Sequence, residues 1–129
     1  MFKYAYPITQ NKELEEINRL IYLQLMRLGF RNTRDGTYHF KNIIITAFCE
    51  TDRELTYTQS IELYSKKIKK SPITIRSEIS QTFCYLNQSR YLSQFIDIFK
   101  YESDSTLITP SSLFESFEAF LQLKNFKQS

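Results

Sequence analysis

The sequence predicts an all-α domain of about six helices. Glycine and proline number only 2 and 3 among 129 residues, whereas hairpin-rich β proteins use these residues at most of their turns. Apolar residues recur every three or four positions in several segments, and helix-starting residues stand ahead of those segments. With 42% hydrophobic residues the chain can bury one core, so we expect an N-terminal arm at residues 1–10 and a single domain over residues 11–129.

The first predicted helix spans about residues 11–28. Asn11 is a suitable N-cap, and the glutamates that follow it suit the positive end of the helix dipole. Gly29 suits the position after the helix end, where left-handed backbone is common. The stripe of residues expected to face the core is Leu14, Ile17, Ile21, Leu25 and Leu28.

The second and third helices are predicted from length and capping. After a polar loop at residues 31–36, the segment 37–50 contains the run IIITAF, whose β-branched residues also suit a strand. Its length and its lack of alternation favour a helix, in which the residues expected to face the core are Phe40, Ile43, Ile44, Ala47 and Phe48. Thr56 and Gln59 then form a capping-box pair, which predicts a third helix that ends near Ile68.

Three more helices complete the predicted fold. A fourth is expected from Ser71 to about Asn87, and a fifth over residues 91–99. Ser112 and Glu115 have the spacing of a capping box, so the last helix is expected to begin there. This last helix carries more aromatic residues than one face can bury, which indicates either a cap on the core or a contact with a second copy.

Neither the cysteines nor the apolar runs indicate secretion or a membrane. Cys49 and Cys84 are isolated, so we expect both to be reduced and partly buried. No apolar run approaches the ~18 residues of a membrane span, and the N-terminus lacks a signal-peptide core. We therefore expect a cytoplasmic protein.

The sequence also contains no catalytic or cofactor motif. The single histidine, His39, has no partnered base in the sequence pattern and is expected to pack in the core or at its rim. Glycine-rich phosphate loops and nucleophile elbows are absent from the sequence. Acids near the loops lack metal-ligand spacing: Asp35, Glu50, Asp52 and Glu54. We expect no enzyme, no cofactor and no bound metal.

Positive charge is concentrated in one segment. The net charge of +3 is mild, but five cations stand between residues 66 and 76 without an acid among them: Lys66, Lys67, Lys69, Lys70 and Arg76. Such a run is typical of a solvated loop or of a surface that contacts phosphates. The next residues of the segment KKIKKSPITIRSEISQTF help to choose between the two.

In this segment a short turn joins two helices, which gives either a plain helical hairpin or a helix-turn-helix over about residues 58–87. Ser71 is a good N-cap and Pro72 fits the first helical position. On a helical wheel the apolar residues of the second helix form one arc: Ile75, Ile79, Phe83 and Leu86. The opposite arc is small and polar, which suits a helix that lies in the major groove of DNA. The residues predicted to face bases are Thr74, Arg76, Ser77, Ser80 and Gln81, and those predicted to face phosphates are Lys66, Lys67, Lys69, Lys70 and Ser71.

The same segment resembles a known family. KKIKKSPITIRSEI, residues 66–79, is similar to the run Lys-Lys-aromatic-Asn-Thr-Thr-Ala-Ser-Arg-Val-Glu-Arg-Ala-Ile in the C-terminal DNA-binding domain of the bacterial sporulation response regulator, the stage-zero sporulation protein A family. Upstream, LGFRNTRDGTYHFKNIIITAF has that family's spacing of Gly29 and Gly36. Downstream, FIDIFKY and TPSSLFESFEAFL resemble its later segments. The similarity covers about residues 15–123.

The resemblance implies an all-helical, sequence-specific regulator of transcription that binds double-stranded DNA, with a homodimer contact through the C-terminal aromatic helix. The family carries Arg, Glu, Arg, Arg and His at the five base-facing positions named above, so we expect a different operator here. The family's phosphorylated receiver domain is not part of these residues, and we expect no built-in phosphorylation switch. The alternative is a protein-interaction module that keeps the fold and acts as antagonist or partner of a related regulator without binding DNA. The altered base-facing residues and the small net charge favour this alternative.

Overall fold

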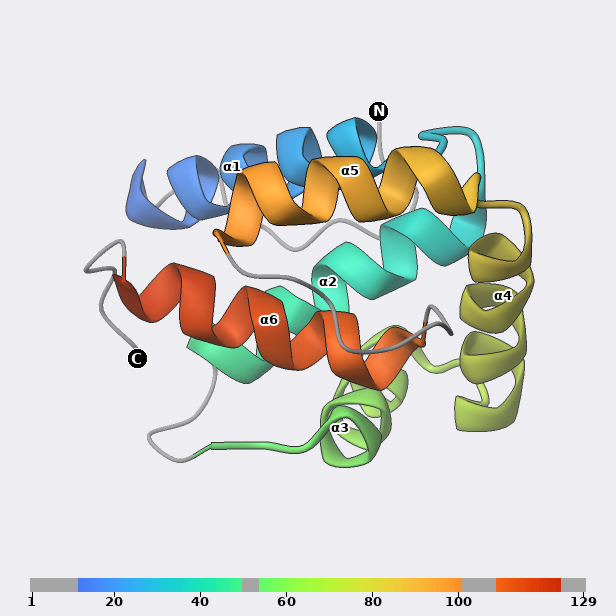
Figure 1. The fold of residues 1–129 in the computed structure, drawn as a ribbon. Helices are drawn as coiled ribbons and strands as arrows, with labels where there is room; N and C mark the ends of the chain where they lie inside the picture. Colours follow the sequence, from blue (N-terminus) through green and yellow to red (C-terminus); the bar gives the residue numbers. More distant parts are fainter. Residues whose placement is uncertain (1–11, 50–53, 101–108, 124–129) are drawn as a thin grey trace.

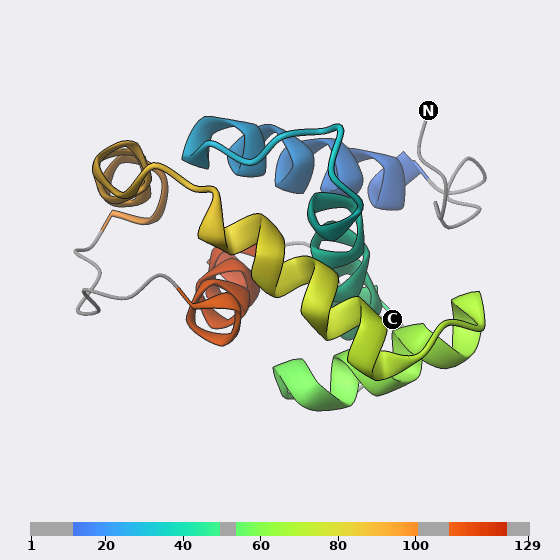
Figure 2. The ribbon, with the colours of Figure 1, turned by 90° about the vertical axis from the view of Figure 1, so that its right-hand side faces the viewer.

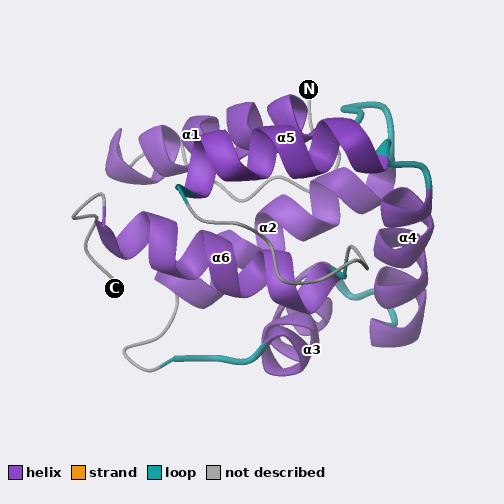
Figure 3. Cartoon of the chain, viewed as in Figure 1, coloured by secondary structure: helices purple, strands orange, loops and turns teal. Residues whose placement is uncertain are grey.

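The computed structural model describes residues 12–49, 54–100 and 109–123, which form helices joined by loops, with no strand among them (Figure 3). The helices are α1 Lys12–Leu28, α2 Asp35–Cys49, α3 Tyr57–Ile68, α4 Pro72–Cys84, α5 Gln88–Phe99 and α6 Pro110–Leu123. The predicted all-α class with six helices is therefore confirmed. The arm expected at residues 1–10 lies outside the described residues.

The central helix is α2, which contacts α1, α3, α4 and α6. In Figure 1 it crosses the middle of the molecule behind α6, and α1 and α5 run side by side above it. Residues 36–48 are all buried. Because α2 is covered on every side, it buries not only the predicted apolar stripe but also its polar residues: Thr37, His39, Lys41, Asn42 and Thr46.

Two of the buried polar side chains of α2 have hydrogen-bond partners inside the fold, while the buried Thr37 hydroxyl has none among the described residues. Lys41 Nζ donates to Asn18 Oδ1 of α1 at 2.7 Å, and Thr46 Oγ1 donates to the Asn42 carbonyl oxygen at 2.8 Å. Burial lowers the pKa of Lys41 to about 8, because the ammonium loses its hydration. The helical wheel predicted one inward face for this segment and could not anticipate that the other face is covered as well.

Gly36 explains why α2 begins at Asp35 and not at residue 37, as the polar loop 31–36 had suggested. A Cβ atom at Gly36 would lie 2.0 Å from Thr82 Oγ1 and 2.3 Å from the Glu78 carbonyl oxygen, both on α4. The absence of a side chain at Gly36 lets the first turn of α2 press directly against α4. This glycine therefore serves helix packing within α2, and the predicted role as the end of a loop is wrong.

Two further helix starts differ from the prediction by a few residues. The fourth helix ends at Cys84, and Asn87 Oδ1 accepts a hydrogen bond from Arg90 N at 2.9 Å, so Asn87 caps the start of α5. At α6 the cap is Thr109, whose Oγ1 accepts from Ser112 N at 3.3 Å. Several Ser, Thr and Asn residues stand near each boundary, and tertiary packing decides which of them becomes the cap.

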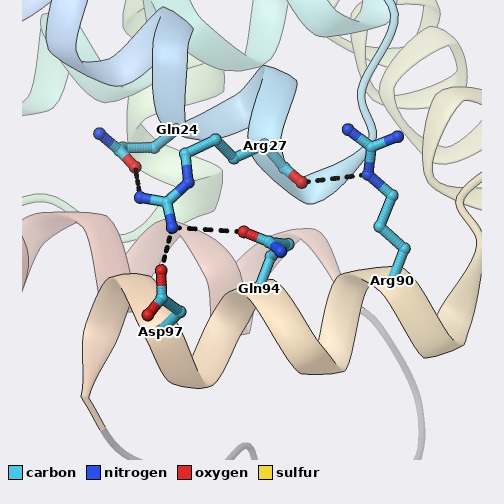
Figure 4. A network of polar contacts seen from close by, with 5 residues as sticks. All are labelled: Gln24, Arg27, Arg90, Gln94 and Asp97. Carbon is cyan, nitrogen blue, oxygen red and sulfur yellow. Dashed lines mark hydrogen bonds and ion pairs between the residues drawn. The ribbon is translucent and has the colours of Figure 1, made fainter.

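The end of α1 is held against α5 by polar contacts along the length of α5 (Figure 4). The Arg27 guanidinium donates to Asp97, to Gln94 at 3.3 Å and to Gln24 at 3.2 Å. From α5, Arg90 Nε donates to the Arg27 carbonyl oxygen at 3.2 Å. These contacts give the loop that follows α1 a defined position beside the last turn of α4.

Candidate nucleic-acid interface

The helices α3 and α4 are joined by the short turn at residues 69–71, as predicted. Both Lys69 N, in the C-cap of α3, and Lys70 N donate to the Ser65 carbonyl oxygen. Lys69 has a left-handed backbone, with φ 57° and ψ 46°, which lets the chain reverse direction after α3. Ser71 Oγ then accepts from Ile73 N at 3.2 Å, with Pro72 in the first turn of α4.

The fourth helix lies across one face of the molecule, as Figure 2 shows. Its inner side consists of residues that the wheel had assigned to the core, since Ile75, Ile79 and Phe83 are buried. Its outer side is exposed at all five residues predicted to face bases: Thr74, Arg76, Ser77, Ser80 and Gln81. Most of the outer side therefore carries hydroxyl and amide groups that can exchange hydrogen bonds with water or with a ligand.

Two exposed apolar side chains accompany this outer side. Ile73 is 80% exposed and Tyr85, just after the helix, is 68% exposed. Sequence reasoning missed Ile73, although the wheel places it beside Ser77 and Ser80 and away from the core stripe. Because Ile73 lies among the residues predicted to face bases and is almost fully exposed, this position is the clearest addition to the predicted site.

The lysines of the turn separate into two groups. Lys66, Lys67 and Lys69 are exposed, whereas Lys70 is partly buried and its Nζ lies 2.9 Å from Glu78 Oε1. The carboxylate of Glu78 is only 25% exposed and faces the turn, not the outer side of α4. Lys70 therefore departs from the predicted phosphate-facing set, and Glu78 does not interrupt the outer side of the helix.

Glu78 also connects this turn to the buried centre of the fold. His39 Nε2 lies 3.4 Å from Glu78 Oε1, and His39 Nδ1 lies 2.8 Å from the Tyr64 hydroxyl. Burial lowers the pKa of His39, and Glu78 offsets only part of this shift. The histidine is thus neutral, and a proton on Nε2 lets the Tyr64 hydroxyl donate to Nδ1 while the N–H faces the carboxylate. Residues of α2, α3 and α4 and the turn are held in one polar chain, as expected for a histidine that packs in the core.

Arg76 occupies a different environment from its predicted neighbours. It lines a cleft of about 770 Å³ between the start of α3, α4 and α6, together with Glu54, Glu115 and Glu118. Burial, and then the charges of Glu54 and Glu115, raise the pKa of Glu118 to about 7. The cleft therefore places acids near Arg76, on the flank of α4 and away from the centre of its outer side. The wheel put Arg76 on that flank but could not show the acids of α6.

The aromatic residues of α6 are largely used inside the domain. Phe114 and Phe117 are buried, and the partly buried Phe120 contacts Phe99 and Phe117, with ring centroids 5.6 Å and 6.3 Å apart. Leu123 is the large apolar side chain that α6 leaves exposed, at 81%. The phenylalanines of α6 thus cap the core, which was one of the two roles predicted for them.

The remaining candidates in the described part of the chain are the cysteine, the possible metal ligands and the apolar helices. Cys84 is a free thiol and exposed, so the expectation of partial burial is wrong for it; the residue lies opposite the core stripe of α4. Among residues 12–49, 54–100 and 109–123, no group of three or more His, Cys, Asp or Glu side chains is placed to hold a metal ion. None of the helices in these ranges has the length and apolar character that crossing a bilayer requires.

Comparisons of the chain with protein-family models, with curated proteins and with solved structures found no match.

Proposed function

We propose that this protein is a double-stranded DNA-binding regulator of transcription in which α3, the turn at residues 69–71 and α4 act as a helix-turn-helix. The observation that carries the proposal is the outer side of α4, where small hydroxyls and Gln81 are exposed beside the exposed Lys66, Lys67 and Lys69. Small residues allow close approach to the floor of the major groove, and lysines at the helix start meet phosphates there.

The inward position of Glu78 also supports this proposal. An acid on the outer side of α4 would be repelled by the phosphates on both sides of the groove. Because Glu78 pairs with Lys70 and faces His39, the outer side carries no carboxylate from α4. Ile73 adds an apolar group suited to the methyl group of thymine, a contact that distinguishes thymine from cytosine.

The residues would have separate roles. Lys66, Lys67, Lys69 and the exposed N-cap Ser71 would contact phosphates and fix the orientation of the domain. Ile73, Thr74, Ser77, Ser80 and Gln81 would contact base edges. Arg76 would contribute less to base contacts than these residues, because the glutamates of its cleft offset part of its charge.

The test is duplex binding as a function of salt. We expect a pool of random duplexes to be bound at low ionic strength, with affinity falling steeply as salt increases. Selection from that pool should yield a preferred site, and Gln81→Ala should change the preferred bases while Lys69→Gln weakens binding to all duplexes alike. Absence of measurable binding to any duplex at low salt would reject the proposal.

A second candidate function is favoured by the exposure of Ile73 and Tyr85. These side chains also suit a protein interface, in which the domain binds a related regulator and does not bind DNA. In that case Ile73→Ser should abolish association with the partner, and Lys69→Gln should have little effect on it. The two variants thus distinguish the candidates, because the DNA-binding proposal makes Lys69 the more important residue for affinity.

A further inference from the structure

A second group of basic residues lies at the opposite end of α4 from the lysines. A cavity of about 470 Å³ opens there between the end of α1, the loop that follows it, and the connection from α4 to α5. Its lining includes Arg31, Asn32, Thr33, Tyr85, Asn87 and Arg90, and it contains no carboxylate. The charge of this lining is thus positive, whereas the cleft at Arg76 contains three glutamates and one arginine.

Two of the arginines in this region are held in place without being neutralised by an acid. Arg90 donates from Nε to the Arg27 carbonyl oxygen at 3.2 Å (Figure 4). One of its Nη atoms donates to the Met26 carbonyl oxygen at 3.2 Å. The Arg34 guanidinium carbon lies 3.8 Å from the centroid of the Tyr85 ring. Carbonyl oxygens and an aromatic face orient a guanidinium while leaving its positive charge in place. Arg27, in contrast, is paired with Asp97.

Arg31 and Arg90 are exposed, and Arg34 is partly buried. Arg31 stands in the loop between α1 and α2, and both Arg31 and Arg90 line the cavity. Arg34, three residues later, covers Tyr85 from the same loop. The three guanidinium groups therefore come from two separate elements, the loop after α1 and the first turn of α5, and gather around the C-terminal end of α4. The start of α5 lies beside the end of α1 in Figure 1, and the C-terminal end of α4 leads into α5 in Figure 2.

The two basic groups lie far enough apart along α4 to reach the phosphates on both sides of a groove. With 13 residues, α4 is about 20 Å long at 1.5 Å per residue. Lys66, Lys67 and Lys69 stand at one end of this length, and Arg31, Arg34 and Arg90 at the other. The major groove is about 12 Å wide and is bordered by a phosphate backbone on each side. A helix of this length that lies in the groove brings its two ends to opposite strands.

We propose that Arg31, Arg34 and Arg90 form a second phosphate-binding site, which contacts the DNA strand opposite the one contacted by the lysines of the turn. The proposal rests on the proposed function and adds to it the orientation of α4 in the groove. The outer side of α4, which carries no carboxylate from this helix, lies between the two sites and faces the bases. The Tyr85 hydroxyl, beside Arg34, supplies a further donor to phosphate oxygen.

The test compares salt dependence in charge-matched variants. The double variant Arg31→Gln with Arg34→Gln removes two cations from the site, and the control Lys12→Gln with Arg19→Gln removes two exposed cations from α1. Duplex affinity is measured for each at several salt concentrations by fluorescence anisotropy. We expect the first variant to reduce the slope of log K against log salt by about 1–2, since each lost phosphate contact contributes about 0.9, and the control to leave the slope nearly unchanged.

Further variants distinguish the loss of a phosphate contact from the unfolding of the double variant. Arg31→Gln alone, at an exposed position, should reduce the slope by about half as much even if loss of the Arg34–Tyr85 contact unfolds the double variant. Lysine at positions 31 and 34 should restore most of the slope because the charges remain. If Lys69→Gln reduces the slope but the arginine variants behave like the α1 control, this inference is wrong and the proposed function stands. If the unaltered protein binds no duplex at low salt, both are rejected.

Discussion

Lys70 Nζ lies 2.9 Å from Glu78 Oε1, with about a quarter of each side chain exposed to solvent. This pair joins the turn between α3 and α4 to a polar chain that continues from Glu78 to His39 and Tyr64. It therefore assigns to Lys70 a role in holding α4, and leaves contact with phosphates to the lysines that precede it, Lys66, Lys67 and Lys69.

The first prediction concerns the division of roles between Lys70 and Lys67. Lys70→Gln should lower the free energy of unfolding by about 1–2 kcal/mol, because it leaves the half-buried Glu78 carboxylate facing a neutral histidine. Lys67→Gln, at an exposed position, should change it by less than about 0.5 kcal/mol. Urea denaturation measures both. Equal stability of the two variants would show that the pair with Glu78 contributes nothing.

For duplex binding the order of the two variants is expected to be the opposite of their order in stability. Lys67→Gln should reduce the salt slope of duplex binding by about 0.9, and Lys70→Gln should reduce it by less. A double-mutant cycle with Glu78→Gln should give a coupling of about 1 kcal/mol in stability. A larger loss of slope for Lys70 than for Lys67 would contradict the assignment of Lys70 to the interior.

The second prediction uses two lysines with left-handed backbone. Lys69 ends α3 with φ 57°, and Lys100 ends α5 with φ 66°. Glycine adopts this conformation without the Cβ penalty, so Lys69→Gly and Lys100→Gly should each stabilise the protein by about 0.5–1 kcal/mol. Thermal unfolding measures the gain.

The pair separates stability from binding. Lys69→Gly should weaken duplex binding and reduce its salt slope by about 0.9, even though the variant is more stable. Lys100→Gly removes the same charge and relieves the same strain at the end of another helix, so it should leave duplex binding unchanged. Identical binding by the two variants would exclude Lys69 from the interface.

The third prediction tests the contact between α2 and α4. Gly36→Ala adds a Cβ at 2.0 Å from Thr82 Oγ1 and 2.3 Å from a backbone oxygen of α4, so α4 must shift. We expect a loss of about 3 kcal/mol in the free energy of unfolding. Because the displaced helix is the one proposed to lie in the groove, duplex binding should fall more than in an equally destabilised variant such as Leu121→Ala in the core of α6.

Thr82→Ala supplies the matching control. Combined with Gly36→Ala it removes the nearest side-chain oxygen but not the Glu78 carbonyl oxygen, so it should recover only part of the loss. Full recovery would mean that the hydroxyl alone sets the distance between the helices. No loss on Gly36→Ala would show that the two helices do not need this approach.

The sequence was sufficient where a structural signal is local. Thr56 and Gln59 form the predicted capping box, with hydrogen bonds of 3.0 and 3.1 Å in the two directions, and Ser71 caps α4 as predicted. Such signals involve residues three or four apart, and their geometry is set by the helix itself. The apolar arc of α4 was predictable for the same reason.

The sequence was insufficient where two distant segments decide the outcome. Gly36 resembled a loop residue because its neighbour, Thr82, is far along the chain. The sequence did not show which way the Glu78 side chain points, because His39, which lies beside it, belongs to α2. Arg76 was predicted to face bases with four other residues of α4, and the structure adds the acids of α6 in its cleft. In each case a side chain at the edge of a helical face is directed by whichever helix packs next to it, and the sequence does not identify that helix.

The last prediction concerns the acids around Arg76. The pKa of Glu118 is raised from 4.5 to about 7, first by burial and then by Glu54 and Glu115. The folded protein therefore binds more protons than the unfolded chain between pH 4.5 and 7, so this group's contribution to stability falls as pH rises through that window. Glu118→Gln cannot titrate and should lose less stability than the unaltered protein between pH 5 and pH 8.

Chemical denaturation at the two pH values measures the difference, with Glu16→Gln, an exposed glutamate of α1, as the charge-matched control. At pH 8 the Glu118 variant should be more stable than the unaltered protein, while the Glu16 variant should match it. The Glu118 variant should also bind duplexes more tightly at pH 8, since one negative charge has been removed beside Arg76 and the proposed interface. Tighter binding of equal size in the Glu16 variant would mean that net charge alone is responsible, and that the cleft does not act on Arg76.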